Sequence, residues 1–174
     1  MDKNTTIRPR TYRAIYRLLD RVSPVPFDCG RICGATCCDY RDDEEMGLFF
    51  LPGESAIHDK SDPWLEWFEE RTEDYFLPES WDETFDFVRC LGPAHCNRAK
   101  RPIQCRSFPL LPHLDADGTL TLIKNDAPLP YCCPLIEDEV ELDPRFCQAT
   151  LTAWKHLIRD PRIYDLVEMD SRER

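Results

Sequence analysis

The chain has 174 residues, ten of them cysteine, and carries 33 acidic against 22 basic side chains. This length fits one domain that can bury a hydrophobic core by itself, which excludes a small scaffold held together mainly by disulfides. The net charge of −11 disfavours nucleic acid and anionic membrane surfaces as partners, because both repel an acidic protein.

The start of the chain has no feature of a secretory signal. The residues after Met1 are polar and basic, and no stretch approaches the roughly eighteen apolar residues of a membrane span. We therefore expect one cytoplasmic domain over residues 1–174. It divides into an N-terminal helix within 1–27, a cysteine-cluster core at 28–136 and C-terminal helices at 143–170.

Three elements are predicted in the first half of the chain. Apolar residues at helical spacing predict a helix over 10–21, whose arginine-rich outer face suits docking on an acidic surface of the same chain. "GLFFLPGE", residues 47–54, predicts a strand closed by a Pro-Gly turn. "SDPWLEWFEER", residues 61–71, predicts a helix with Pro63 at its first position.

The second half of the chain predicts strands followed by helices. "YFLPE" at 75–79 and "ETFDFVRC" at 83–90 are typical of short strands, and residues 107–126 predict a hairpin that turns at "DADG". Helices are expected to begin at Asp143-Pro144 and at Asp160-Pro161. The predicted fold class is α+β, a small, mostly antiparallel sheet with helices at both ends of the chain and loops organised around a cysteine-rich metal site.

Nine of the ten cysteines fall into three blocks. The first block is Cys29, Cys33, Cys37 and Cys38, the second is Cys90, Cys96 and Cys105, and the third is Cys132 and Cys133. Cys147 stands alone on a predicted helix, where a buried apolar role is expected.

Three chemistries compete for these thiols. In a reducing cytoplasm, clustered cysteines are more often metal ligands than disulfides, although an oxidising compartment would reverse this preference. Thiol–disulfide exchange is disfavoured because neither a C-x-x-C pair nor a βαβ pattern is present. Four converging thiolates favour zinc, copper(I) or an iron–sulfur cluster. The first block gathers three thiols on one side either through turns at Gly30 and Gly34 or as a helical face.

Several neighbouring residues leave alternatives open. In an extended chain Cys37 and Cys38 point in opposite directions, so one of them is free to reach a second ion, to bridge two ions or to pack. Arg101 and Arg106 either donate hydrogen bonds to cysteine sulfurs or pair with carboxylates. His95 and His113 are secondary ligand candidates, whereas His58 and His156 are expected to be ordinary surface or loop histidines.

Several motifs in the right order resemble the YkgJ-type, or CxxCxxCC, cysteine-cluster family, which is described as chelating zinc or iron. They are the first cysteine block, "LPGE" at 51–54, the box that runs from Cys96 through "RPIQCRSFP" at 101–109, and Cys133-Pro134. The resemblance covers residues 28–136. The chain departs from the family pattern in the wider first gap, C-x3-C, and in the segment after Cys96.

The resemblance implies a metal-ligand set of eight cysteines, in which Cys133 is preferred over Cys132 because a proline follows it. The set is Cys29, Cys33, Cys37, Cys38, Cys90, Cys96, Cys105 and Cys133. The expected cofactor is zinc or iron, held for a structural, storage or delivery role in two four-coordinate sites or one cluster.

Two other functions compete with plain metal binding. One is an iron–sulfur protein in electron transfer or a redox reaction. The resemblance extends to flagellin lysine N-methylases, but this chain lacks the glycine-rich strand-turn-helix that would hold a nucleotide or methyl donor. The other is a disulfide-stabilised interaction protein, against which the missing signal peptide counts.

Overall fold

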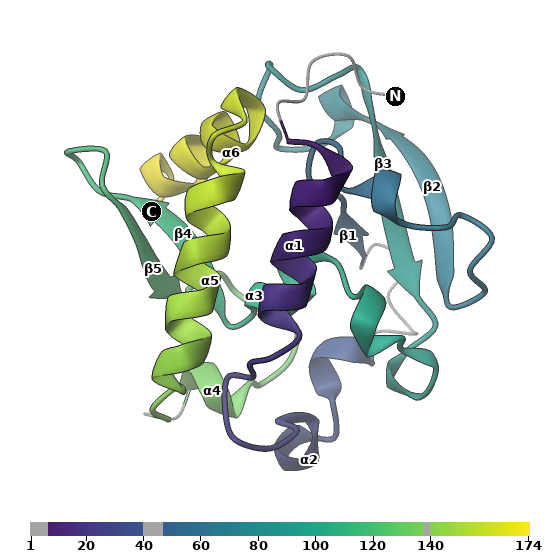
Figure 1. Ribbon diagram of the computed structural model, residues 1–174, viewed down its shortest axis with the longest axis vertical. Coiled ribbons are helices and arrows are strands. Elements are labelled where there is room, and N and C mark those ends of the chain that lie inside the picture. Colours follow the sequence, from purple (N-terminus) through teal and green to yellow (C-terminus); the bar gives the residue numbers. More distant parts are fainter. Residues whose placement is uncertain (1–6, 40–46, 138–139) are drawn as a thin grey trace.

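The computed structural model describes residues 7–39, 47–137 and 140–174. Two helices, α1 (Pro9–Leu19) and α5 (Pro144–Leu157), lie side by side at the centre of the molecule. The larger sheet lies on one side of this pair and a β-hairpin on the other, while the short helices α2 (Gly30–Cys33) and α4 (Pro134–Glu137) lie at one end (Figure 1). The fold class is α+β, as the sequence predicts.

Two separate antiparallel sheets make up the β structure. The first has the order β1-β3-β2, with β1 at Leu48–Phe49, β2 at Leu65–Arg71 and β3 at Thr84–Cys90. The second is the hairpin of β4 (Leu110–Leu114) and β5 (Leu120–Lys124). The hairpin turns at "DADG" as predicted, since Gly118 has a φ of 80°.

The main core lies among α1, α5 and α6 (Pro161–Arg172). Tyr12 on α1, Leu157 on α5 and Ile163 on α6 are all 0% exposed. Both C-terminal helices begin where predicted, because the carboxylates of Asp143 and Asp160 accept hydrogen bonds from backbone N–H groups of the first helical turn.

The helix predicted at 61–71 is wrong, because this segment forms β2. It pairs with β3 along its whole length. Trp67 and Phe68, which share a helical face, instead lie on opposite faces of the sheet: Trp67 stacks on Phe50 at 5.1 Å, and Phe68 packs against Phe87 at 6.4 Å. Aromatic side chains suit such a two-sided strand, and the pairing partner outweighs the helix-start signal.

The strand predicted at 75–79 is also wrong, since this stretch is irregular. Tyr75 packs edge-on against Phe85 at 5.1 Å, while Phe76 is 66% exposed. Pro78 lacks the N–H that a ladder would need.

The arginines predicted on the outer face of α1 are exposed, but docking on the same chain is not seen. Within the described residues, no carboxylate forms an ion pair with any of the five, which are Arg8, Arg10, Arg13, Arg17 and Arg21. Among the described residues, no helix is long and apolar enough to cross a membrane.

Candidate metal centre

Most of the cysteines lie on or beside short helices and turns. In the first block, Cys29 is the N-cap and Cys33 the last residue of the single-turn helix α2 (Gly30–Cys33), and Cys37 and Cys38 lie in the 3-10 turn η1 (Thr36–Cys38). Cys90 ends β3, and Cys96 follows the 3-10 turn η4 (Pro93–His95). Cys105 lies in α3 (Ile103–Ser107), and Cys133 directly precedes α4 (Pro134–Glu137).

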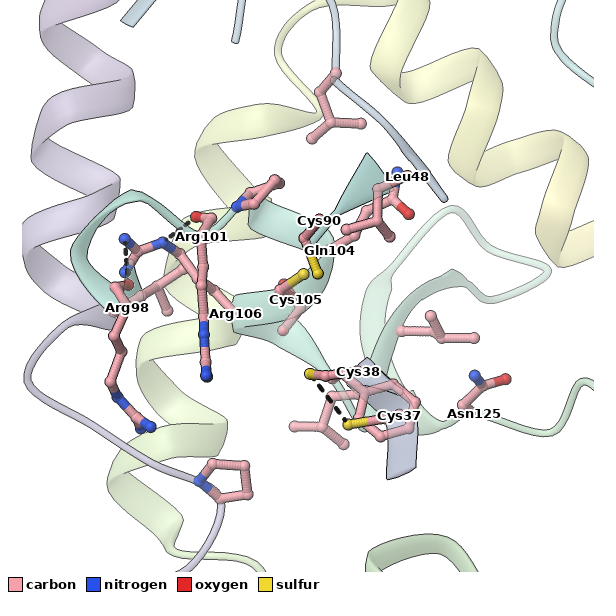
Figure 2. Close-up of a pocket in the computed structure, with 18 of the residues that line it drawn as sticks. Cys37, Cys38, Leu48, Cys90, Arg98, Arg101, Gln104, Cys105, Arg106 and Asn125 are labelled. Atoms are coloured by element: carbon pink, nitrogen blue, oxygen red, sulfur yellow. Dashed lines mark hydrogen bonds between the residues drawn. The ribbon is translucent and has the colours of Figure 1, made fainter. Parts of the chain in front are cut away.

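Six of the eight predicted ligands line one cavity of about 370 Å³. They are Cys29, Cys37, Cys38, Cys90, Cys96 and Cys105. Figure 2 shows four of them, with the sulfurs of Cys90 and Cys105 near each other and the Cys37–Cys38 pair facing them across the cavity. Three stretches of chain, far apart in sequence, therefore bring thiols to one place.

The first cysteine block forms two turns joined by a reversal, not one continuous helix. Gly34 and Ala35 both take left-handed backbone conformations, with φ of 69° and 59°. Gly34 thus supplies the tight turn expected of it, whereas Gly30 is an ordinary helical residue.

The adjacent cysteines do not point apart, contrary to the argument from an extended chain. Cys37 and Cys38 lie in a 3-10 turn and not in an extended chain, and their sulfurs are only 3.7 Å apart. Two sulfurs bound to one tetrahedral zinc ion at about 2.3 Å are separated by about 3.8 Å. A disulfide would need about 2.05 Å. The two sulfurs are therefore not bonded to each other, and they are close enough to serve one ion or two neighbouring ions.

The first group of thiols is defined by the charges that act on Cys29 and Cys37. Burial raises the pKa of Cys29, and the charges of Cys33 and Cys133 raise it further. Cys37 belongs with them, since Cys29 and Cys33 contribute to raising its pKa after the hydrogen bond to Cys38 and burial. Cys29 and Cys133 also share an apolar cluster with Val25. We call Cys29, Cys33, Cys37 and Cys133 the first quartet.

The second group of thiols is defined by the charges that act on Cys105. Burial raises the pKa of Cys105, and the charges of Cys38, Cys90 and Cys96 raise it further. Cys90 and Cys96 both pack against the apolar cluster that contains Trp64. We call Cys38, Cys90, Cys96 and Cys105 the second quartet. The adjacent Cys37–Cys38 pair joins the two quartets.

Cys38 is the more acidic thiol of the Cys37–Cys38 pair. The hydrogen bond from Cys37 lowers the pKa of Cys38 to about 7, and the nearby Arg101 guanidinium lowers it too. A metal binds the thiolate and not the thiol, so this sulfur is prepared for ligation near neutral pH.

The two remaining cysteines lie apart from the quartets. Cys132 is exposed, and its hydrogen bond to Glu137 raises its pKa. The neighbouring Cys133 is buried, and the charge of Cys33 adds to burial in raising its pKa. Cys147 is only partly buried, where a buried apolar role was expected, and the charge acting on it is that of Asp143.

The two arginines of the "RPIQCRSFP" box have different roles. Arg101 donates a hydrogen bond from Nε to Cys96 Sγ at 3.0 Å, which is the thiol-directed contact expected. Arg106 instead pairs with the Asp20 carboxylate at 2.6 Å and donates to backbone carbonyls, so the carboxylate alternative holds for it. Its side chain is 5% exposed, so this is a buried contact and not a surface pair.

The sulfurs are gathered but not closed around a point. Within residues 7–39, 47–137 and 140–174, no three histidine, cysteine, aspartate or glutamate side chains are placed to hold one ion together. His95 is exposed, and neither His95 nor His113 lines the cavity. Binding would therefore require the cysteine loops to move closer together.

Three residues near the site escaped sequence reasoning. Glu54 is fully buried and accepts a hydrogen bond from the Tyr16 hydroxyl, which also contacts His58 Nε2. His58 lies on a loop, as expected, but it is partly buried and takes part in this network. Glu54 ends the "LPGE" motif, but no local signal marked its contacts with Tyr16, 38 positions earlier, or with Ile103, 49 positions later.

Comparisons of the chain with protein-family models, curated proteins and solved structures find no match.

Proposed function

We propose that this protein binds zinc or iron through its cysteine thiolates. The observation that supports the proposal most strongly is that six cysteines from separate stretches of chain line one cavity. The full ligand set proposed is Cys29, Cys33, Cys37, Cys38, Cys90, Cys96, Cys105 and Cys133. Ligation by four thiolates closes a zinc site to water, which favours a structural, storage or delivery role over hydrolysis.

The division into quartets favours two sites over one. Each quartet contains four cysteines, the number of ligands that a tetrahedral ion needs, and the Cys37–Cys38 spacing of 3.7 Å allows the two sites to be neighbours or to share a sulfur. Arg101, which donates a hydrogen bond to Cys96, offsets negative charge on the second quartet, because each thiolate adds a negative charge to a partly buried site. Two ions per chain is therefore the proposed stoichiometry.

An iron–sulfur cluster is the second candidate, and the cavity favours it. A single ion bound by four sulfurs about 3.8 Å apart encloses no free volume. The cavity of about 370 Å³ is many times the roughly 30 Å³ that one water molecule occupies in the liquid. It thus has room for a polynuclear cluster, and hydrogen bonds such as that from Arg101 to Cys96 tune the potentials of such clusters.

Cobalt(II) titration tests the ligand set directly, because thiolate-to-cobalt charge-transfer absorption reports the number of bound sulfurs. We expect Cys133→Ser to lower the affinity at least tenfold and to remove charge-transfer intensity, since a hydroxyl is a poor substitute for a thiolate. Cys132→Ser is the matched control, with a change of less than twofold expected. Equal effects of the two substitutions would contradict the assignment of Cys133.

A further inference from the structure

A fully buried carboxylate lies next to the cysteine-bearing helix α3 without belonging to the thiol set. Glu54 is 0% exposed and accepts three hydrogen bonds. The donors are the Tyr16 hydroxyl at 2.6 Å, the Leu51 backbone N–H at 3.0 Å and the Ile103 backbone N–H at 2.7 Å. A buried carboxylate is costly unless such donors compensate it, so this geometry holds three segments of the chain at one point.

The start of α3 depends on Glu54 for a hydrogen-bond partner. The first N–H groups of a helix have no acceptor within the helix, and the preceding Pro102 offers no side-chain cap. Glu54 supplies that acceptor to Ile103 from 49 positions away in the sequence. Cys105 lies two residues beyond Ile103 in the same short helix, so this contact helps to hold the turn that carries its sulfur.

The end of α3 is held by contacts that return to the same tyrosine. The Arg106 guanidinium lies 4.2 Å from the centre of the Tyr16 ring and pairs with Asp20 on the same side of α1. It also donates to the backbone carbonyl of Arg101, as Figure 2 shows. Tyr16 therefore contacts Glu54 through its hydroxyl and Arg106 through its ring, with Cys105 between the two fixed ends.

We propose that Glu54 is a positioning residue for the thiol site, holding α3 so that Cys105 faces Cys38, Cys90 and Cys96. The metal role of these thiols rests on the proposed function, but the positioning itself does not require metal.

His58 forms the outer end of the same network. Its Nε2 lies 2.8 Å from the Tyr16 hydroxyl, which has a single proton to donate. The Tyr16 hydroxyl donates its proton in the hydrogen bond to Glu54. In the contact with His58, Nε2–H is therefore the donor and the Tyr16 hydroxyl oxygen the acceptor. His58 thus orients the phenol toward Glu54.

The test is the alkylation rate of individual cysteines in the reduced, folded chain with chelator present, measured by mass spectrometry. In Glu54→Gln, the amide has one acceptor oxygen where the carboxylate has two, and its NH2 group faces an N–H donor. We expect the rate at Cys105, relative to that at Cys133, to rise at least tenfold. This corresponds to about 1.4 kcal/mol of lost local stability.

Asp160→Asn is the matched control. Asp160 is also a 0% exposed carboxylate, but it caps α6 and pairs with Arg162 away from the thiols. The Asp160→Asn substitution should destabilise the fold while changing the ratio of the Cys105 to Cys133 alkylation rates less than twofold. If Glu54→Gln does not fold, Tyr16→Phe removes one of the three hydrogen bonds, and we expect it to raise the ratio about threefold.

A cobalt(II) titration of the same variants separates the two proposals. Weakened binding in folded Glu54→Gln, with unaltered binding in Asp160→Asn, is expected. An unchanged Cys105 to Cys133 ratio in folded Glu54→Gln, or in Tyr16→Phe where that variant replaces it, would overturn the positioning role even where metal binds normally. If the wild-type chain bound no metal while Glu54→Gln still raised the Cys105 to Cys133 ratio, the proposed function alone would be overturned.

Discussion

The helical side and the cysteine-bearing side of this molecule are held together by different contacts. On the helical side, Leu157 and Ile163 are completely buried. On the cysteine-bearing side, α2 and η1 contain no buried residue at all, and Ile32 within α2 is 47% exposed. Apolar burial stabilises the first region, whereas the second has little apolar area to offset its conformational entropy. Bound metal would supply that missing free energy.

Metal removal should produce the largest difference between the two regions. With chelator present, we expect amide hydrogen exchange of residues 29–38 to accelerate at least a hundredfold, because the thiols lose the ion that orders them. Exchange in α5 should change only a few-fold. A uniform change along the chain, or no change in melting temperature on chelation, would contradict the comparison.

A substitution that creates a cavity in the helical core should lower the stability of the fold without affecting the thiol site. Ile163→Ala removes a fully buried side chain and should lower the free energy of unfolding in urea by about 2–5 kcal/mol. The metal content of the folded fraction should stay the same. Ile32→Ala, at a 47% exposed position beside the cysteines, is the control and should change stability by less than about 0.5 kcal/mol.

The pH dependence of stability tests the carboxylate between the two regions. Burial raises the pKa of Glu54 from 4.5 to about 7. The folded state therefore binds a proton that the unfolded state has released, and this stabilisation is lost as the pH rises through 7. Relative to Glu54→Gln, the wild-type chain with chelator present should lose about 2 kcal/mol between about pH 5.5 and 8.

If the free energies of unfolding of the wild-type chain and Glu54→Gln changed in parallel with pH, Glu54 would not titrate in this range and the prediction would be wrong. His58 does not obscure the comparison, because both proteins retain it. Burial lowers the pKa of His58 to about 4, so its own contribution is lost only as the pH falls.

Thiol reactivity should give the smallest effect and sharpen the picture inside the cysteine region. Because the pKa of Cys38 is lowered to about 7, its alkylation in the metal-free chain should reach half its maximal rate near that pH. Cys132, whose pKa is raised, should react at higher pH although it is exposed. If Cys38 and Cys132 were alkylated with the same midpoint pH, the lowering of the Cys38 pKa by the hydrogen bond from Cys37 would be contradicted.

Sequence patterns predicted the helical side better than the cysteine-bearing side. Asp143-Pro144 and Asp160-Pro161 carry their own start signals, so local chemistry was enough to place α5 and α6. The segment that forms β2 has a helix-like start at Pro63, and only its pairing with β3, which no local pattern shows, makes it a strand.

Within the candidate site, the family resemblance supplied the eight candidate ligands, six of which line the cavity. It did not show the left-handed turn at Gly34 and Ala35 or the 3.7 Å spacing of the Cys37 and Cys38 sulfurs. The roles of Tyr16 and His58 could not be predicted, because they arise from contacts between residues about 40 positions apart.

Metal analysis of the anaerobically purified chain tests the central claim most directly. We expect zinc or iron at about two ions per chain if each quartet holds one, or brown protein with iron and acid-labile sulfide if the site holds a cluster. Anaerobic handling matters because oxidation destroys labile clusters and thiolate sites. A metal-to-protein ratio near zero, with ten free thiols on titration of the unfolded chain, would contradict the account.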